Sequence, residues 1–191
     1  MVGMVRRAVI MVSVLLSAVG ASPPGAARAE PSSALDDLVD AAAQRLQTAD
    51  AVAANKWLTG APITDPARVQ QVLAAVTAEA QAAGVPPDYA TAVFTDQINA
   101  TEGVQYSRFS WWKFDPSTAP ASAPDLAASR SVIDGLNHEM VAQIGRQWPV
   151  LQSPDCAAAL SAAKNTVADA RGLDALYRQA LDAATRSYCR G

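Results

Sequence analysis

The stretch SALDDLVDAAAQRL, residues 33–46, gives the clearest indication of the fold of this chain. A serine followed three residues later by an acidic residue is typical of a helix start. Apolar residues then recur at helical spacing, at Leu35, Leu38, Val39, Ala42 and Leu46. Alanine is the strongest helix former, and the chain contains 42 alanines among its 191 residues. We therefore predict an all-α protein.

Outward from this stretch, capping residues and helix breakers divide the chain into a single domain of about six helices. Asp65-Pro66 begins the second helix and Pro86-Pro87-Asp88 the third, since proline suits the first helical turn. Residues 115–124, DPSTAPASAP, are the one clear linker. The helices are expected from 33 to about 57, over 65–84, from 86 to the linker, from 125 to just before Pro149, over 153–172, and from there to Cys189.

Residues 1–29 are predicted to be a cleaved secretory signal peptide. Arg6 and Arg7 form a basic start, Ala8–Val19 an apolar run, and Ala27-Arg28-Ala29 a cleavage site. An apolar run of about 12 residues is too short to span a membrane as a helix, although an uncleaved anchor is the alternative. The mature chain, residues 30–191, would carry 12 basic and 18 acidic residues, a net charge of −6. We expect an exported protein, periplasmic or secreted, with no membrane attachment after cleavage.

Two cysteines and one histidine limit the chemistry of the chain. Cys156 and Cys189 are the one available pair, and an exported protein meets an oxidising compartment. We therefore predict a disulfide that joins the hairpin of the last two helices, with two free buried thiols as the alternative. A zinc site built from Cys and His is nearly excluded. The acidic balance disfavours a nucleic-acid partner.

Basic side chains lie on the apolar faces of the predicted helices, where acids are scarce. Arg45 follows Leu38 by seven residues and Arg130 follows Leu126 by four, so each arginine shares a helix face with core residues. A buried arginine is costly unless it is paired. The basic residues placed in this way are Arg45, Lys56, Arg68 and Arg130. Because the arginine fork suits carboxylate or phosphate, we predict that they converge on a small external anion.

The third predicted helix contributes polar groups to the same interior. Its apolar face continues through Ile98 and then becomes polar at Thr101 and Gln105. The alternative for each cation is that its side chain reaches the surface, or pairs with an ordinary acid such as Asp96 or Glu102.

Seven segments make the sequence similar to a known family. They are LVDAAAQRL (38–46), NKW (55–57), DPARV (65–69), DQINATE (96–102), QYSRF (105–109), SRSVIDGLN (129–137) and SYC (187–189). Together they resemble the exported chorismate mutases of the all-helical AroQ class, the gamma subgroup of mycobacteria and related bacteria. The resemblance covers essentially the whole mature chain. It implies an AroQ-type fold and a homodimer in which each active site lies within one subunit.

The resemblance also implies an isomerase that converts chorismate to prephenate by an intramolecular [3,3] rearrangement. This chemistry needs no nucleophile, metal or cofactor. Arg45 and Arg130 would bind the carboxylates of the substrate, and Lys56 and Gln105 would donate to the ether oxygen of the breaking bond. Arg68 would add positive charge, Thr101 a hydroxyl contact, and Asp65 a contact near the substrate hydroxyl. Lys56, Gln105 and Arg45 form the expected catalytic set.

At two positions, 105 and 72, the residue in this chain affects the activity or substrate binding that the family resemblance implies. Relatives carry Glu or Gln at the position of Gln105, and a Glu must be protonated to donate, whereas Gln donates at any pH. Position 72 is Val, where a close secreted relative is expected to have a polar amide, so Val72 would weaken binding of the hydroxyl end of the substrate. Two other functions stay open from the sequence: an isochorismate pyruvate-lyase of the same fold, and a non-catalytic secreted binding module.

Overall fold

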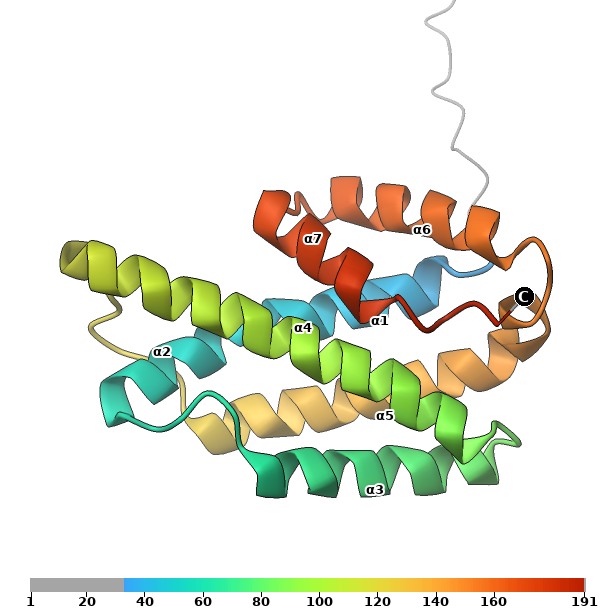
Figure 1. Cartoon of the computed structure of the whole chain (residues 1–191), viewed down its shortest axis with the longest axis horizontal. Helices are drawn as coiled ribbons and strands as arrows, with labels where there is room; N and C mark the ends of the chain where they lie inside the picture. The colour runs from blue at the N-terminus through green and yellow to red at the C-terminus, as the bar shows by residue number, and fades with distance from the viewer. Residues whose placement is uncertain (1–32, 191) are drawn as a thin grey trace, which may run out of the picture. The chain divides into compact units, whose positions relative to one another are not determined.

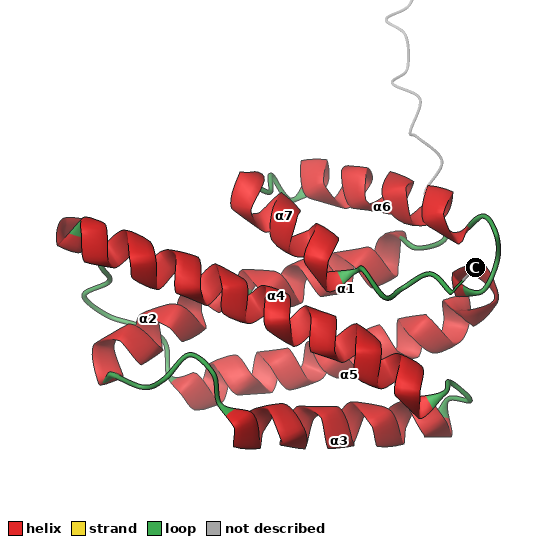
Figure 2. Ribbon diagram, viewed as in Figure 1, coloured by secondary structure: helices red, strands yellow, loops and turns green. Residues whose placement is uncertain are grey.

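The computed structural model describes residues 33–190, which form an all-α fold (Figure 2). The predicted fold class is therefore confirmed. The signal peptide predicted at residues 1–29 lies outside the described residues. Within the described range, no helix is long and apolar enough to cross a membrane. The elements are α1 (Asp36–Gln47), α2 (Ala49–Thr59), α3 (Pro66–Ala82), α4 (Pro87–Phe114), the 3-10 helix η1 (Pro116–Thr118), α5 (Leu126–Leu151), α6 (Cys156–Ala170) and α7 (Ala175–Ala184).

Helix α4, with 28 residues, contacts α1, α2, α3 and α7. Figure 1 shows α4 running across α1, with α3 on one side of it and the α6–α7 pair on the other. Phe94 of α4 is fully buried, as are Leu38 and Leu46 of α1. The apolar faces predicted for these helices thus meet in one hydrophobic core.

The first predicted helix is divided into α1 and α2 at Thr48, so the expectation of one continuous helix is wrong there. The Thr48 N–H donates to the Arg45 carbonyl oxygen at 3.2 Å, and the Thr48 hydroxyl donates to the same oxygen at 2.7 Å. The N–H contact replaces the regular bond to the carbonyl four residues back, the hydroxyl contact adds a second bond to the same oxygen, and a threonine hydroxyl in this role often bends a helix. Arg45 therefore lies on α1 and Lys56 on α2, and both line the same pocket.

Two predicted helix ends also differ from the structure. Helix α5 continues through Pro149 to Leu151. Proline lacks the N–H that would bond to the carbonyl four residues back, but only two helical residues follow it, so little helix lies beyond the disturbance. Helix α7 ends at Ala184 and does not reach Cys189. The chain then turns toward the end of α5, where the Arg190 N–H donates to the Leu151 carbonyl oxygen at 3.1 Å.

Cys156 and Cys189 form the predicted disulfide, with their Cα atoms 5.6 Å apart. The bond joins the start of α6 to the segment after α7 and so closes the C-terminal hairpin. The alternative of two free thiols is excluded. In the chain-entropy model, closing a loop of 33 residues stabilises the fold by roughly 3–4 kcal/mol.

Candidate active site

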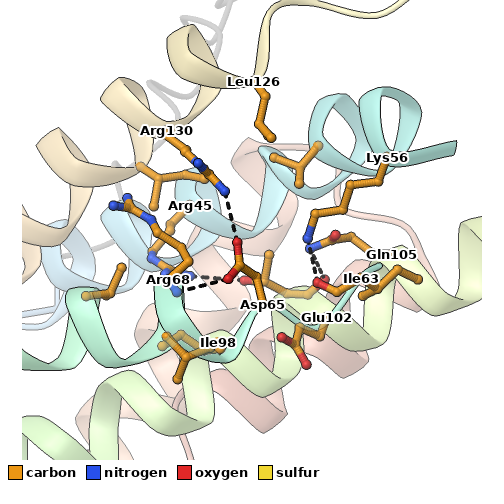
Figure 3. A pocket seen from close by; sticks show the side chains of 15 residues that line it. Arg45, Lys56, Ile63, Asp65, Arg68, Ile98, Glu102, Gln105, Leu126 and Arg130 are labelled. Carbon is orange, nitrogen blue, oxygen red and sulfur yellow. Dashed lines mark hydrogen bonds and ion pairs between the residues drawn. The ribbon is translucent and has the colours of Figure 1, made fainter. Parts of the chain in front are cut away.

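A pocket is lined by α1–α5 and by the loop between α2 and α3 (Figure 3). All seven substrate-site residues expected from the family resemblance line it: Arg45, Lys56, Asp65, Arg68, Thr101, Gln105 and Arg130. The other lining residues are Val52, Ile63, Val69, Val72, Ile98, Glu102, Leu126 and Ile133. Folding therefore brings the four cations into one cavity, and the roles of the individual residues stay predictions.

Arg45, on α1, is the most deeply placed of the four cations, with 4% of its surface exposed. Its Nε donates to Asn137 Oδ1 at 2.6 Å and one terminal nitrogen to Thr101 Oγ1 at 3.1 Å. Burial, with repulsion from Arg68 as a smaller cause, lowers the pKa of Arg45 to about 10. Arg45 is therefore still charged at neutral pH, and its direct partners are uncharged.

Lys56, on α2, is buried as well, and its Nζ donates to the carbonyl oxygen of Ile63 at 2.5 Å. Burial lowers the pKa of Lys56, while the nearby charges of Glu102 and Asp65 act in the opposite direction. Ile63 lies in the loop between α2 and α3, so this bond also fixes the loop against the pocket. Figure 3 shows the lysine and Gln105 on the same side of the cavity.

Arg68 and Arg130 stand at the more exposed side of the pocket and have carboxylate partners. Arg68 contacts Asp134 at 2.5 Å, and Arg130 contacts Asp65 at 3.0 Å. Asp65 is also the N-cap of α3, because its other oxygen accepts from the Arg68 N–H at 3.0 Å. Arg68 and Arg130 thus pair with acids of the protein itself, which is the alternative that the sequence left open.

The acids named in that alternative have other partners. Asp96 accepts from the Ser187 hydroxyl at 2.7 Å. Glu102 lines the pocket and accepts from the Thr64 hydroxyl at 3.0 Å. Neither forms an ion pair with a pocket cation among residues 33–190.

Helix α4 supplies the polar groups on one wall, since Thr101 and Gln105 lie one turn apart on its buried face. The Gln105 Nε2 donates to the Thr101 carbonyl oxygen at a long 3.4 Å, and its Oε1 is buried without a partner among the described residues. The Gln105 amide is therefore only weakly held by the protein. A buried amide with free hydrogen-bonding capacity is suited to contact a polar atom of a ligand.

The remaining wall of the pocket is apolar. Val72 of α3 is 5% exposed and packs in the main core, next to Val76 and Ala80 of the same helix face. With an apolar wall facing several cations, the pocket suits a compact ring or chain that carries anionic groups.

Sequence reasoning did not assign three further groups to the site: the Ile63 carbonyl, Glu102 and Asn137. Glu102 directly follows Thr101 and stands one turn before Gln105, which is a signal that could have identified it. Asn137 lies on the buried face of α5, and its contact with Arg45 joins α5 to α1, 92 residues apart. No local pattern encodes such a contact.

An all-helical fold with a cationic, partly apolar pocket defines a class of small-molecule-binding protein that recognises an anionic compound by charge and shape. Comparisons with known proteins agree with this class and narrow it. The family model for chorismate mutase type II matches residues 34–106. A secreted chorismate mutase of Mycolicibacterium smegmatis is 53% identical over 181 residues, covering 95% of this chain and 100% of the relative.

A secreted chorismate mutase of Mycobacterium tuberculosis is 50% identical over 180 residues, covering 94% of this chain and 90% of the relative. Among solved structures, the chorismate mutase from Burkholderia phymatum has a TM-score of 0.78 and 35% identity, covering 83% of this chain and 97% of that one. The chain belongs to the chorismate mutase type II family.

Proposed function

We propose that this protein is an exported chorismate mutase that isomerises chorismate to prephenate. The observation that carries the proposal is the arrangement of four cations and Gln105 around an apolar pocket, in a chain of this family. Because the rearrangement is intramolecular, the protein has to hold the reactive conformer and stabilise the charge that develops in the transition state. No covalent intermediate is required.

Arg45 and Arg130 are the proposed partners of the two substrate carboxylates. They approach the cavity from α1 and α5 and so can hold two anionic groups at separate points (Figure 3). Arg68 adds a third positive charge, close enough to Arg45 to lower its pKa. For Arg130, binding a substrate carboxylate means exchanging the exposed contact with Asp65 for a bond to the substrate.

Lys56 and Gln105 are the proposed donors to the ether oxygen. The bond to Ile63 uses one of the three ammonium hydrogens of Lys56, which leaves two for the substrate. Gln105 has a weakly held amide whose N–H groups are donors at any pH. Two donors aimed at the oxygen that gains negative charge would favour the transition state over the bound substrate.

Thr101 and Asp65 complete the proposed site. The Thr101 hydroxyl donates to the Gln97 carbonyl oxygen at 2.7 Å and accepts from Arg45, so toward a substrate it would act as an acceptor. The Asp65 carboxylate faces the cavity and would accept from the substrate hydroxyl. The apolar side chain of Val72 offers no hydrogen bond there, which supports the expectation of weaker binding at that end.

We further propose that the chain is exported after cleavage near residue 29 and acts as a homodimer. The charged, apolar and small-residue regions of the signal pattern support export, and both curated relatives are called secreted. One chain supplies all seven substrate-binding residues expected from the family resemblance to a single pocket, which supports an active site that is contained within one subunit of the dimer.

The test is a chorismate-consumption assay on the mature chain from Glu30, with the product identified. Prephenate should form, and Arg45→Ala should abolish its formation. Arg178→Ala is the matched control, because it removes an exposed arginine of α7 that pairs with Asp169 and lies outside the pocket. Prephenate formation that survives Arg45→Ala would contradict the proposed site.

The two alternative functions predict different products. An isochorismate pyruvate-lyase would release pyruvate from isochorismate, so pyruvate release without prephenate formation would favour the lyase. A binding module would bind chorismate in calorimetry without converting it. The weakly held amide of Gln105 beside Lys56 favours the mutase, since a binding module needs no donor pair for the ether oxygen.

A further inference from the structure

The three arginines of the pocket differ in the charge of their hydrogen-bond partners. Arg68 and Arg130 contact carboxylates, whereas Arg45 contacts the amide oxygen of Asn137 and the hydroxyl of Thr101. Asn137 and Thr101 are 5% and 7% exposed, so these bonds are shielded from water. Arg45 is thus held by neutral acceptors in the deepest part of the site.

The geometry around Arg45 fixes the orientation of its guanidinium group. Asn137 from α5 binds the Nε hydrogen, and Thr101 from α4 binds one terminal nitrogen. The Thr101 hydroxyl gives its own hydrogen to the Gln97 carbonyl oxygen, which directs a Thr101 lone pair toward Arg45. Of the five N–H groups of the guanidinium, three are left for a ligand, in a plane set by three helices.

Neutral acceptors orient the group without cancelling its charge. A carboxylate at position 137 would accept the same Nε hydrogen, but it would also neutralise Arg45 and weaken the attraction for an anionic substrate. We propose that Asn137 is a positioning residue, whose uncharged amide oxygen fixes Arg45 for a substrate carboxylate and leaves the positive charge of Arg45 to that carboxylate. This inference rests on the proposed function, in which Arg45 binds the substrate.

The decisive variant is Asn137→Asp, which keeps the size and the acceptor atom and adds one negative charge. We expect its KM for chorismate to rise about 10- to 100-fold, because the added charge weakens the charge-assisted bond between Arg45 and a substrate carboxylate, and such bonds contribute about this factor. The midpoint of thermal unfolding should not fall, because the new carboxylate compensates a buried arginine. The effect should appear in KM more than in kcat, since a carboxylate contact made in substrate and transition state alike is weakened equally in both.

Asn165→Asp is the matched control. Asn165 is exposed on α6, outside the pocket, and the substitution changes the net charge by the same amount. Its KM should equal that of the unmodified chain. A correctly folded Asn137→Asp variant with unchanged KM would overturn the inference.

A second variant, Asn137→Ala, covers the case in which the aspartate variant does not fold. It leaves the Arg45 Nε hydrogen without its acceptor, and we expect kcat/KM to fall about 10-fold or more. A purely structural role would lower the unfolding midpoint and leave kcat/KM of the folded enzyme unchanged, which would overturn the proposal. Failure of the proposed function would appear in the unmodified chain as a lack of turnover. In that case the ratio of chorismate dissociation constants, measured by calorimetry for the unmodified chain and Asn137→Asp, tests the role of Asn137 directly.

Discussion

Replacing Gln105 by Glu tests the proposed donor to the ether oxygen. Gln105 is 4% exposed, its Oε1 has no partner among the described residues, and its amide nitrogen is held at 3.4 Å. An ionised glutamate at this position has no hydrogen to donate and places a negative charge where the transition state develops one. Removing one donor of this kind typically costs about 2.7–4 kcal/mol, or about 10²–10³ in kcat. We expect a loss of at least this size at pH 7.5.

The pH profile distinguishes this reasoning from a general disturbance of the site. Gln105 does not titrate, so kcat/KM of the unmodified chain should be nearly flat from about pH 5 to 8. In Gln105→Glu the donating form is the protonated acid. Activity should therefore be lowest above the pKa of the new carboxyl group and rise as the pH falls through it, by about tenfold per pH unit at the limiting slope.

Two controls complete the experiment. Gln105→Leu removes the donor without adding a titrating group, so its activity should be low and independent of pH over the same range. Gln179→Glu makes the same charge change on the exposed face of α7 and should behave like the unmodified chain. A steep profile in the unmodified chain, or a Gln105→Glu variant with full activity at pH 7.5, would refute the reasoning.

Four further results are expected. Lys56→Met should lower kcat by about 10²–10³. Burial lowers the pKa of Lys56, so in the unmodified chain the charged lysine should be lost at a lower pH than a free lysine would be. The fall of kcat at alkaline pH measures this. Asp134→Asn should lower KM by freeing Arg68, while changing the unfolding free energy little, since exposed ion pairs contribute about 0–1 kcal/mol. Val72→Gln should lower KM through a new contact with the substrate hydroxyl and lower the unfolding midpoint, because it buries a polar group. Reduction of the Cys156–Cys189 bond should lower the free energy of unfolding by roughly 3–4 kcal/mol and leave kcat unchanged, since neither cysteine lines the pocket.

The sequence predicts the fold where local signals act alone. Asp65 caps α3 through its side chain, and Gly84 and Gly172 follow the ends of α3 and α6 with positive φ, as the helix-ending pattern indicates. The predicted helix boundaries are wrong where a side chain or a distant segment of the chain affects the path of the backbone. The predicted first helix is divided at Thr48, whose hydroxyl bonds to the Arg45 carbonyl oxygen. Beyond α7 the chain is only partly buried, and it returns to α5 and to Cys156.

In the site, too, local signals place the residues on helix faces, whereas contacts between distant residues are not predicted. Helical spacing places Arg45 and Arg130 on buried faces, and both line the pocket. The partners of these cations lie on other elements: Arg45 meets Asn137 across 92 residues, and Arg130 meets Asp65 across 65. Helical periodicity specifies which face of a helix a residue occupies, but not which residue of another helix it contacts.

The distribution of acids around the pocket gives the four cations two different tasks. Arg68 and Arg130 have side chains that are 19% and 41% exposed, and their carboxylate partners are more than one-third exposed, so water can screen those ion pairs and a substrate carboxylate can compete for them. Arg45 and Lys56 are buried and bonded to uncharged oxygens, so their charge is not cancelled by direct contact. An anion that enters from the exposed side would thus exchange partners with Arg68 and Arg130 first and then reach two cations whose charge is still available. Since electrostatic interactions strengthen as water is excluded, Arg45 should bind a substrate carboxylate strongly throughout the reaction. Lys56, the proposed donor to the ether oxygen, should be the cation that contributes most to stabilising charge in the transition state.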